Sequence, residues 1–161
     1  MRTVLSVDTG KTGAVGLYYN KGIQGIELHN LDHIGEFIQL AKELIEPKDF
    51  KDEIIAVVEE PPPFTGNFSV PSSSGFKLGK SFGEVTGALR ALGYPLHLVR
   101  PRDWQKGLSG LKGLKGHPRK KILADHARRL MPNAKITIRN ADAALVAYHF
   151  HNNNLTQNTK T

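Results

Sequence analysis

The sequence predicts an α/β fold: a mixed five-stranded sheet, built from an antiparallel meander and parallel strands, with helices on both faces. Three stretches near the N-terminus, residues 3–8, 13–20 and 22–30, are rich in apolar and β-branched residues and are separated by turn residues, which favours a meander. Beyond residue 30, stretches of helical and strand character alternate, which is typical of parallel strands joined by helices.

Four helices are expected from apolar spacing and end signals. Residues 31–47 carry apolar side chains at intervals of three and four, with Asp32 as the expected N-cap. Residues 75–92 and 118–130 predict two more helices, and a last helix is expected after Asn140, a residue type that favours the N-cap. These helices would cover the faces of the sheet.

Two apolar runs supply the remaining strands. Residues 52–60, DEIIAVVEE, hold an unbroken apolar run, as expected of a central strand buried on both faces, and prolines 61–63 prevent further pairing. Residues 94–101 predict a short buried strand, and residues 135–140 a short extended piece. The Gly/Lys-rich residues 109–118 predict a mobile basic loop.

Length and composition indicate one domain. With 161 residues, 39% of them hydrophobic, the chain can bury a single core. We assign residues 1–150 to this domain and expect the polar residues 151–161 to form a disordered tail. The absence of cysteine agrees with a reducing compartment, and no apolar run reaches membrane-spanning length. We expect a cytoplasmic protein of a bacterial or phage-infected cell, an organelle being the other option, with no membrane partner and no small-molecule cofactor.

The charge indicates a polyanionic partner. A formal net charge of +7 favours nucleic acid, because Lys and Arg that neutralise phosphates release condensed counterions. Between residues 100 and 129 basic residues crowd together, and only Asp103 and Asp125 are acidic. The basic residues of this region are Arg100, Arg102, Lys106, Lys112, Lys115, Arg119, Lys120, Lys121, Arg128 and Arg129.

Acidic residues stand where buried elements begin or end. Asp8 ends the first strand, Glu59 and Glu60 end the central strand, and Asp142 opens the last helix. If the two strands are neighbours, their carboxylates meet at one edge, where buried like charges need a cation. Oxygen ligands suit Mg²⁺ or Mn²⁺, and two such ions can promote phosphodiester hydrolysis. Asp8 could instead open a turn, and Asp142 could serve the helix dipole. Strand parity does not choose between the two glutamates, because both sides of the strand are apolar.

Several segments together resemble a known family. In order along the chain, they resemble the successive motifs of RuvC-like Holliday junction resolvases, in the ribonuclease H-like superfamily, over roughly residues 3–150. The segments are LSVDTGKTGAVGLYY, VVEEPPPF, FKLGKSFGEVTGAL, VRPRDWQKGL and NADAALVAYH.

The resemblance implies a metal-dependent endonuclease that acts on branched DNA. Such enzymes are homodimers that nick four-way junctions symmetrically and leave 5′ phosphates. By position, Asp8, Glu59 (rather than Glu60) and Asp142 would be catalytic and would ligate two Mg²⁺ or Mn²⁺ ions. Family members commonly carry a fourth ligand where this chain has Arg139. Candidates for compensation are Glu60, Asn140 and His149, and we assign the role to none of them.

The resemblance also implies surfaces for a second copy and for DNA. Gly79, Gly83 and Gly87 lie on one helix stripe that would face the partner in a homodimer; the alternative is tight packing of this helix on its own sheet. Phe64 and Phe68 would wedge or stack at the junction, and Trp104 is either a core residue or a stacking residue. Phosphate contacts are expected from Lys77, Lys80, Arg102, Lys106, Lys112, Lys115, Lys120 and Lys121.

Other functions remain open at this point. A ribonuclease acting on RNA–DNA hybrids would share fold and metals, and a non-catalytic DNA-binding module would share the basic surface. DTGKTG, residues 8–13, is also similar to the phosphate loop of the actin and sugar kinase superfamily, but those proteins need two related domains. A P-loop is excluded, because Leu5 stands where its first glycine is required.

Overall fold

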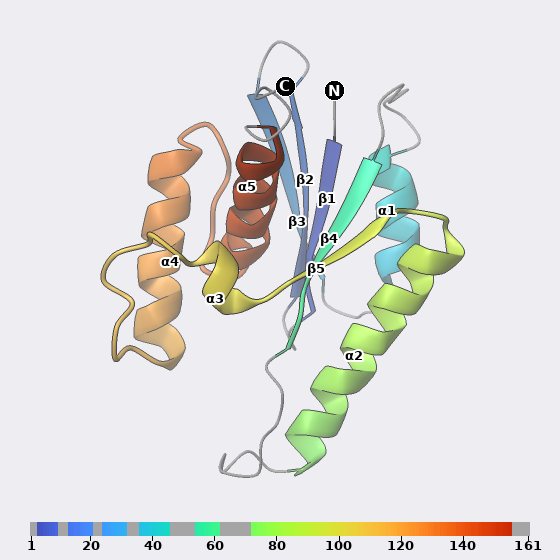
Figure 1. Ribbon diagram of the computed structural model, residues 1–161, viewed down its shortest axis with the longest axis horizontal. Helices are drawn as coiled ribbons and strands as arrows, with labels where there is room; N and C mark the ends of the chain where they lie inside the picture. Colours follow the sequence, from blue (N-terminus) through green and yellow to red (C-terminus); the bar gives the residue numbers. More distant parts are fainter. Residues whose placement is uncertain are drawn as a thin grey trace.

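One mixed sheet with helices on both faces forms the framework of the computed structural model, which describes residues 3–9, 13–20, 24–31, 36–45, 54–61 and 72–155 (Figure 1). The strand order is β3-β2-β1-β4-β5. The first three strands pair antiparallel, whereas β4 pairs parallel to both β1 and β5. The predicted combination of a meander with parallel strands is therefore confirmed. The strands are β1 (Thr3–Asp8), β2 (Gly13–Asn20), β3 (Gln24–Leu31), β4 (Ile54–Glu59) and β5 (Leu96–Val99).

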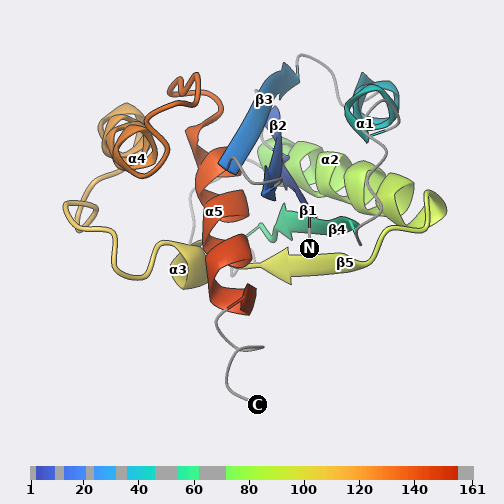
Figure 2. The ribbon, with the colours of Figure 1, turned by 90° about the horizontal axis from the view of Figure 1, so that it is seen from above.

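The helices form two layers (Figures 1 and 2). One layer, α1 and α2, covers one face of the sheet, and the other, α4 and α5, covers the opposite face; the short α3 follows β5. The described helices are α1 (Phe37–Ile45), α2 (Ser72–Ala91), α3 (Pro101–Trp104), α4 (Gly116–Leu130) and α5 (Ala141–Leu155). No helix in the described ranges has the length and apolarity to cross a membrane.

Strand β4, which lies between β1 and the edge strand β5 and not at the centre of the sheet, divides two hydrophobic cores. Its side chains alternate, so Ile55 and Val57 belong to the core under α4 and α5, whereas Ala56 and Val58 belong to the core under α1 and α2. All four are buried. The unbroken apolar run thus has the cause that the sequence predicted, namely burial on both faces.

The alanine-rich start of α5 brings this helix close to the sheet. All residues of its segment 141–147 are buried, and small side chains permit a short distance between the backbones. The Ser6 hydroxyl, on β1, donates to the Ala143 carbonyl oxygen at 2.7 Å. This contact ties the first turn of α5 to the strand that ends at Asp8.

Several element boundaries differ from the predicted ones. Helix α2 begins at Ser72 and α4 at Gly116, in both cases before the predicted start. Helix α5 continues to Leu155, so residues 151–155 are helical and not part of a disordered tail; residues 156–161 lie outside the described part. Residues 32–35, with the expected N-cap Asp32, lie outside it too. The described helix begins only at Phe37.

Two local predictions were wrong. Strand β5 is not buried, because it lies at the edge of the sheet, where Leu98 is 43% exposed. Asn140 precedes α5, but its side chain does not cap the helix: Oδ1 accepts from the Thr137 backbone N–H at 2.8 Å, and Nδ2 donates to the Lys135 carbonyl at 3.2 Å. The side chain therefore holds the turn before the helix rather than its first N–H groups.

Candidate active site

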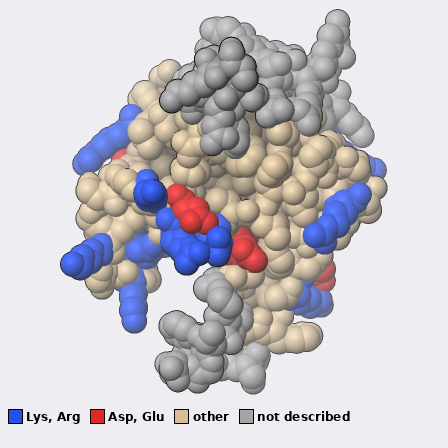
Figure 3. Space-filling model, viewed as in Figure 1, with Lys and Arg blue, Asp and Glu red and all other residues tan. Residues whose placement is uncertain are grey.

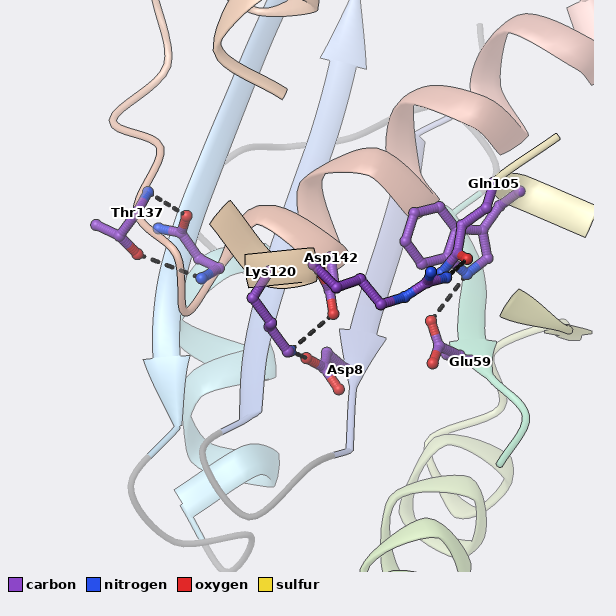
Figure 4. Close-up of polar contacts among 9 residues, drawn as sticks. Asp8, Glu59, Gln105, Lys120, Thr137 and Asp142 are labelled. Carbon is purple, nitrogen blue, oxygen red and sulfur yellow. Dashed lines mark hydrogen bonds and ion pairs between the residues drawn. The ribbon is translucent and has the colours of Figure 1, made fainter. Parts of the chain in front are cut away.

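Three carboxylates meet where strands β1 and β4 end (Figure 4). Asp8 ends β1 and Glu59 ends β4; since Val7 pairs with Val58 in the parallel register, the two acids follow side by side. Asp142 is the second residue of α5, the helix that packs over these strands. The structure therefore brings together the three acids that the sequence singled out, from segments far apart in the chain.

Burial and the neighbouring acids change the protonation of Glu59. Burial, followed by the charges of Asp8 and Asp142, raises the pKa of Glu59 to about 7, although the hydrogen bond from Trp104 and the charge of Lys120 act in the opposite sense. Each factor that raises this pKa disfavours the ionised carboxylate. Near neutral pH, therefore, this group is poised between its two protonation states until further positive charge reaches it.

Lys120, on α4, supplies positive charge from within the chain. Its ammonium nitrogen lies 2.7 Å from Oδ2 of Asp142 and 3.7 Å from Oδ2 of Asp8. Burial alone would lower the pKa of Lys120, but the charges of Asp142 and Asp8 outweigh it, so this pKa is raised. The sequence placed Lys120 among the phosphate contacts; the structure places it among the carboxylates.

Trp104 contacts Glu59 directly. Its indole Nε1 donates a hydrogen bond to Oε2 of Glu59 at 2.8 Å (Figure 4), and its side chain is buried in the core beneath α4 and α5. Of the two alternatives for this residue, core and stacking, the core position is the one observed. The contact with Glu59 had no signal in the sequence, because 45 positions separate the two residues.

The donor atoms fit a hard divalent cation by their chemistry. All three side chains offer carboxylate oxygens, and Oδ1 of Asp142 is buried without a hydrogen-bond partner among the described residues. As placed, however, no three Asp, Glu or His side chains in the described ranges form a group that could hold one metal ion. Lys120 is one reason why the carboxylates are not arranged around a metal position, since its ammonium lies against Asp8 and Asp142.

The three candidates for a fourth ligand, Glu60, Asn140 and His149, are not among the groups that shift the pKa of Glu59. Asn140 is engaged by Thr137 and Lys135, as described above. The ring of His149 contacts the Asn153 amide, and burial lowers the pKa of His149 although the charge of Asp103, in α3, acts in the opposite sense. Glu60 is half-buried and follows the end of β4.

Basic side chains gather on the side of the molecule where α4 lies (Figure 3). Most of the expected phosphate contacts are exposed: Arg102, Lys106, Lys112, Lys115 and Lys121, and on α2 also Lys77 and Lys80. Phe64 and Phe68 lie outside the described residues, so their expected role at the junction stays a prediction.

The loop before α4 is built from a repeat that the sequence reading missed. Every third residue is a glycine with positive φ, between 57° and 91°, a conformation that side chains rarely adopt. Leu108 and Leu111 pack in the core under α4 and α5 and Leu114 is half-buried, whereas the residue after each leucine, Ser109, Lys112 or Lys115, is exposed. The signal was present as the spacing Gly-Leu-X. The glycines are Gly107, Gly110, Gly113 and Gly116.

The glycine stripe of α2 faces open space. A Cβ atom added at Gly79, Gly83 or Gly87 would meet nothing within 4 Å. Tight packing of this stripe on its own sheet, one of the two explanations offered above, is therefore wrong. Phe76, on the same helix, is 73% exposed.

Solved structures of RuvC are similar to this chain in fold. No protein-family model and no curated protein matches the chain. Among solved structures, "T. thermophilus RuvC in complex with Holliday junction substrate" is similar with a TM-score of 0.64 and 18% identity, covering 91% of both chains. "Thermus thermophilus RuvC structure" is similar with a TM-score of 0.63 and 21% identity, covering 96% of both chains. The chain therefore has a RuvC-like fold of the ribonuclease H-like type, as its motifs predicted.

Proposed function

We propose that this protein is a metal-dependent endonuclease that resolves four-way DNA junctions by paired symmetric nicks, leaving 5′ phosphates. The observation that carries the proposal is the convergence of Asp8, Glu59 and Asp142 at one edge of a RuvC-like sheet, beside a basic surface. One of the structurally similar proteins is in complex with a Holliday junction substrate.

The three carboxylates would hold Mg²⁺ or Mn²⁺, two ions in each site. Bound ions of this kind supply an activated water and stabilise the oxygen that leaves phosphorus. The chain contributes oxygen ligands with little exposure, since the side chains of Asp8 and Asp142 are 13% and 12% exposed. Metal binding would require that Glu59 lose its proton and that the Lys120 ammonium leave Asp142. Lys120 would then be available to contact a substrate phosphate.

The basic surface would bind the junction through its phosphates. Leu108 and Leu111 anchor the loop before α4 in the core, and the exposed Lys112 and Lys115 follow leucines at an interval of three residues. Such contacts position DNA without reading sequence, because they engage the backbone and not the base edges. Affinity should therefore fall steeply as salt rises.

Paired nicks require two active sites, and the outer face of α2 offers a surface for a second copy. The open space at Gly79, Gly83 and Gly87 would admit a close backbone, and Phe76 adds exposed apolar area on the same helix. We propose a homodimer formed through this face, in which two junction strands are cut at symmetric positions.

The test is cleavage of labelled DNA by the purified chain in Mg²⁺. We expect paired, symmetric nicks on a four-way junction and little cleavage of linear duplex of the same sequence. Preferred cleavage of an RNA–DNA hybrid would instead assign the alternative ribonuclease activity. Junction binding without any cleavage, in Mg²⁺ or Mn²⁺, would leave a non-catalytic DNA-binding module.

A further inference from the structure

We propose that Trp104 is a positioning residue for Glu59: its indole N–H fixes one carboxylate oxygen and leaves the other for a metal ion shared with Asp8 and Asp142. The inference rests on the proposed function, because it gives Glu59 the role of a metal ligand. It assigns to a core tryptophan a task that neither its burial nor its place in the sequence suggests.

The hydrogen bond has one possible direction. An indole N–H donates and never accepts, so Oε2 of Glu59 must be the acceptor at 2.8 Å. Trp104 is 2% exposed and lies in the core formed with residues of α4, α5 and the loop before α4, among them Leu111 and Leu123. Because the ring cannot leave its place without unpacking this core, the N–H is a fixed point for the carboxylate.

Backbone pairing ties the same two residues together a second time. Glu59 is in register with Val99 of β5, and the Glu60 N–H donates to the Val99 carbonyl at 2.8 Å. Trp104 follows five positions after Val99, at the end of α3, whose Asp103 N–H donates to the Arg100 carbonyl at 2.9 Å. The acceptor on β4 and the donor on α3 are therefore also linked through the backbone pairing of β4 with β5.

An uncharged hydrogen-bond donor is suited to orienting a carboxylate that binds a metal ion. A lysine or arginine at this place would fix Glu59 equally well, but its charge would oppose the approach of a metal ion. The indole orients the carboxylate without adding charge. Partners that orient metal ligands in this way typically change metal affinity about 10- to 100-fold when they are removed.

The chain has a single tryptophan, which makes the test clean. Full-length protein is produced with β-(3-benzothienyl)alanine in place of tryptophan, so that sulfur replaces the N–H while the ring shape is kept. Trp104→Phe serves as a second variant. Mn²⁺ affinity is measured without DNA by calorimetry, and thermal unfolding reports whether each protein is folded. We expect the sulfur analogue to need about tenfold more Mn²⁺ for half saturation.

A spectroscopic arm tests the contact itself. In ¹⁵N-labelled wild type the one indole N–H resonance should shift as Mg²⁺ is added, and Glu59→Gln should abolish that shift. Unchanged Mn²⁺ affinity in a folded sulfur analogue would overturn the positioning role and leave the proposed function intact. Wild type that binds Mn²⁺ with the predicted dependence on Trp104, yet cuts no DNA, would instead overturn the proposed function and keep the positioning role.

Discussion

The ammonium nitrogen of Lys120 lies 2.7 Å from Oδ2 of Asp142. This contact joins α4 to the first turn of α5, and it supplies a positive charge where three carboxylates converge. Lys120 therefore balances part of the charge that divalent ions would balance in the proposed enzyme.

The three carboxylates should be needed for cleavage and not for binding. Asp8→Asn, Glu59→Gln and Asp142→Asn each remove a proposed metal ligand, so we expect cleavage of a four-way junction to fall below detection. Junction affinity should be kept or increase, because a negative charge near phosphate is lost. Rates and dissociation constants are measured side by side. The matched control is Asp125→Asn, which removes the carboxylate of a half-buried residue elsewhere on α4, and this variant should cleave normally.

Lys120 should stabilise the metal-free fold. Lys120→Met leaves Asp8 and Asp142 without their internal counter-charge, but the lysine side chain is 41% exposed, so solvent screens the pair. We expect a loss of about 1 kcal/mol in the free energy of unfolding, well below the cost of breaking a fully buried pair. Chemical denaturation in EDTA measures it, with Lys121→Met, at an exposed neighbouring position, as control. Equal effects of the two changes would contradict the role of Lys120.

The pH dependence of metal-free stability should carry the signature of Glu59. Its folded pKa is raised from 4.5 to about 7, so the folded state binds this proton more tightly than the unfolded state. The stabilising contribution is complete below pH 4.5 and is lost as pH rises through about 7. Denaturation in EDTA across this range should show a decline that Glu59→Gln reduces. A wild-type slope identical to that of the variant would refute the assignment.

Metal uptake should release protons at neutral pH. Because Glu59 is partly protonated near pH 7 in the metal-free state, a bound divalent cation must displace that proton. Mn²⁺ affinity should therefore rise between pH 6 and 8, and calorimetric heats should depend on the ionisation enthalpy of the buffer. Heats that are independent of the buffer would mean that no proton leaves.

The outer face of α2 should control self-association without affecting the fold. Gly83→Leu places a side chain in open space in the monomer, so the folded structure tolerates it and gains helix propensity. In the proposed dimer the same side chain blocks close approach, so sedimentation should show a shift toward monomer and junction cleavage should lose its pairing. Glu84→Leu, an exposed change one position further along the helix, is the control. Intact dimer in Gly83→Leu would place the interface elsewhere.

The sequence predicted the order of strands and helices well, because alternating and helical periodicity follow directly from burial on a sheet. Strand parity could not choose between Glu59 and Glu60, since Val57 and Val58 are both buried, and only the family resemblance favoured Glu59. The choice depends on which helices cover which face. Glu59 lies on the side of Ile55 and Val57, under α4 and α5, where Asp142 and Trp104 are found.

Contacts between distant side chains were beyond the reach of the sequence. Lys120 and Lys121 look alike in a basic run, and only the rotation of α4 directs the first of them to Asp142. The edge position of β5 was also hidden, because a strand with Leu96 and Leu98 reads as buried until its neighbours are known.

Mn²⁺ anomalous scattering from crystals of the full chain can show whether Asp8, Glu59 and Asp142 bind metal ions together. We predict anomalous peaks bonded to oxygens of all three carboxylates, with the Lys120 ammonium moved away from Asp142. Saturating Mn²⁺ with no peak at these residues, or with Lys120 still bound to Asp142, would contradict the account.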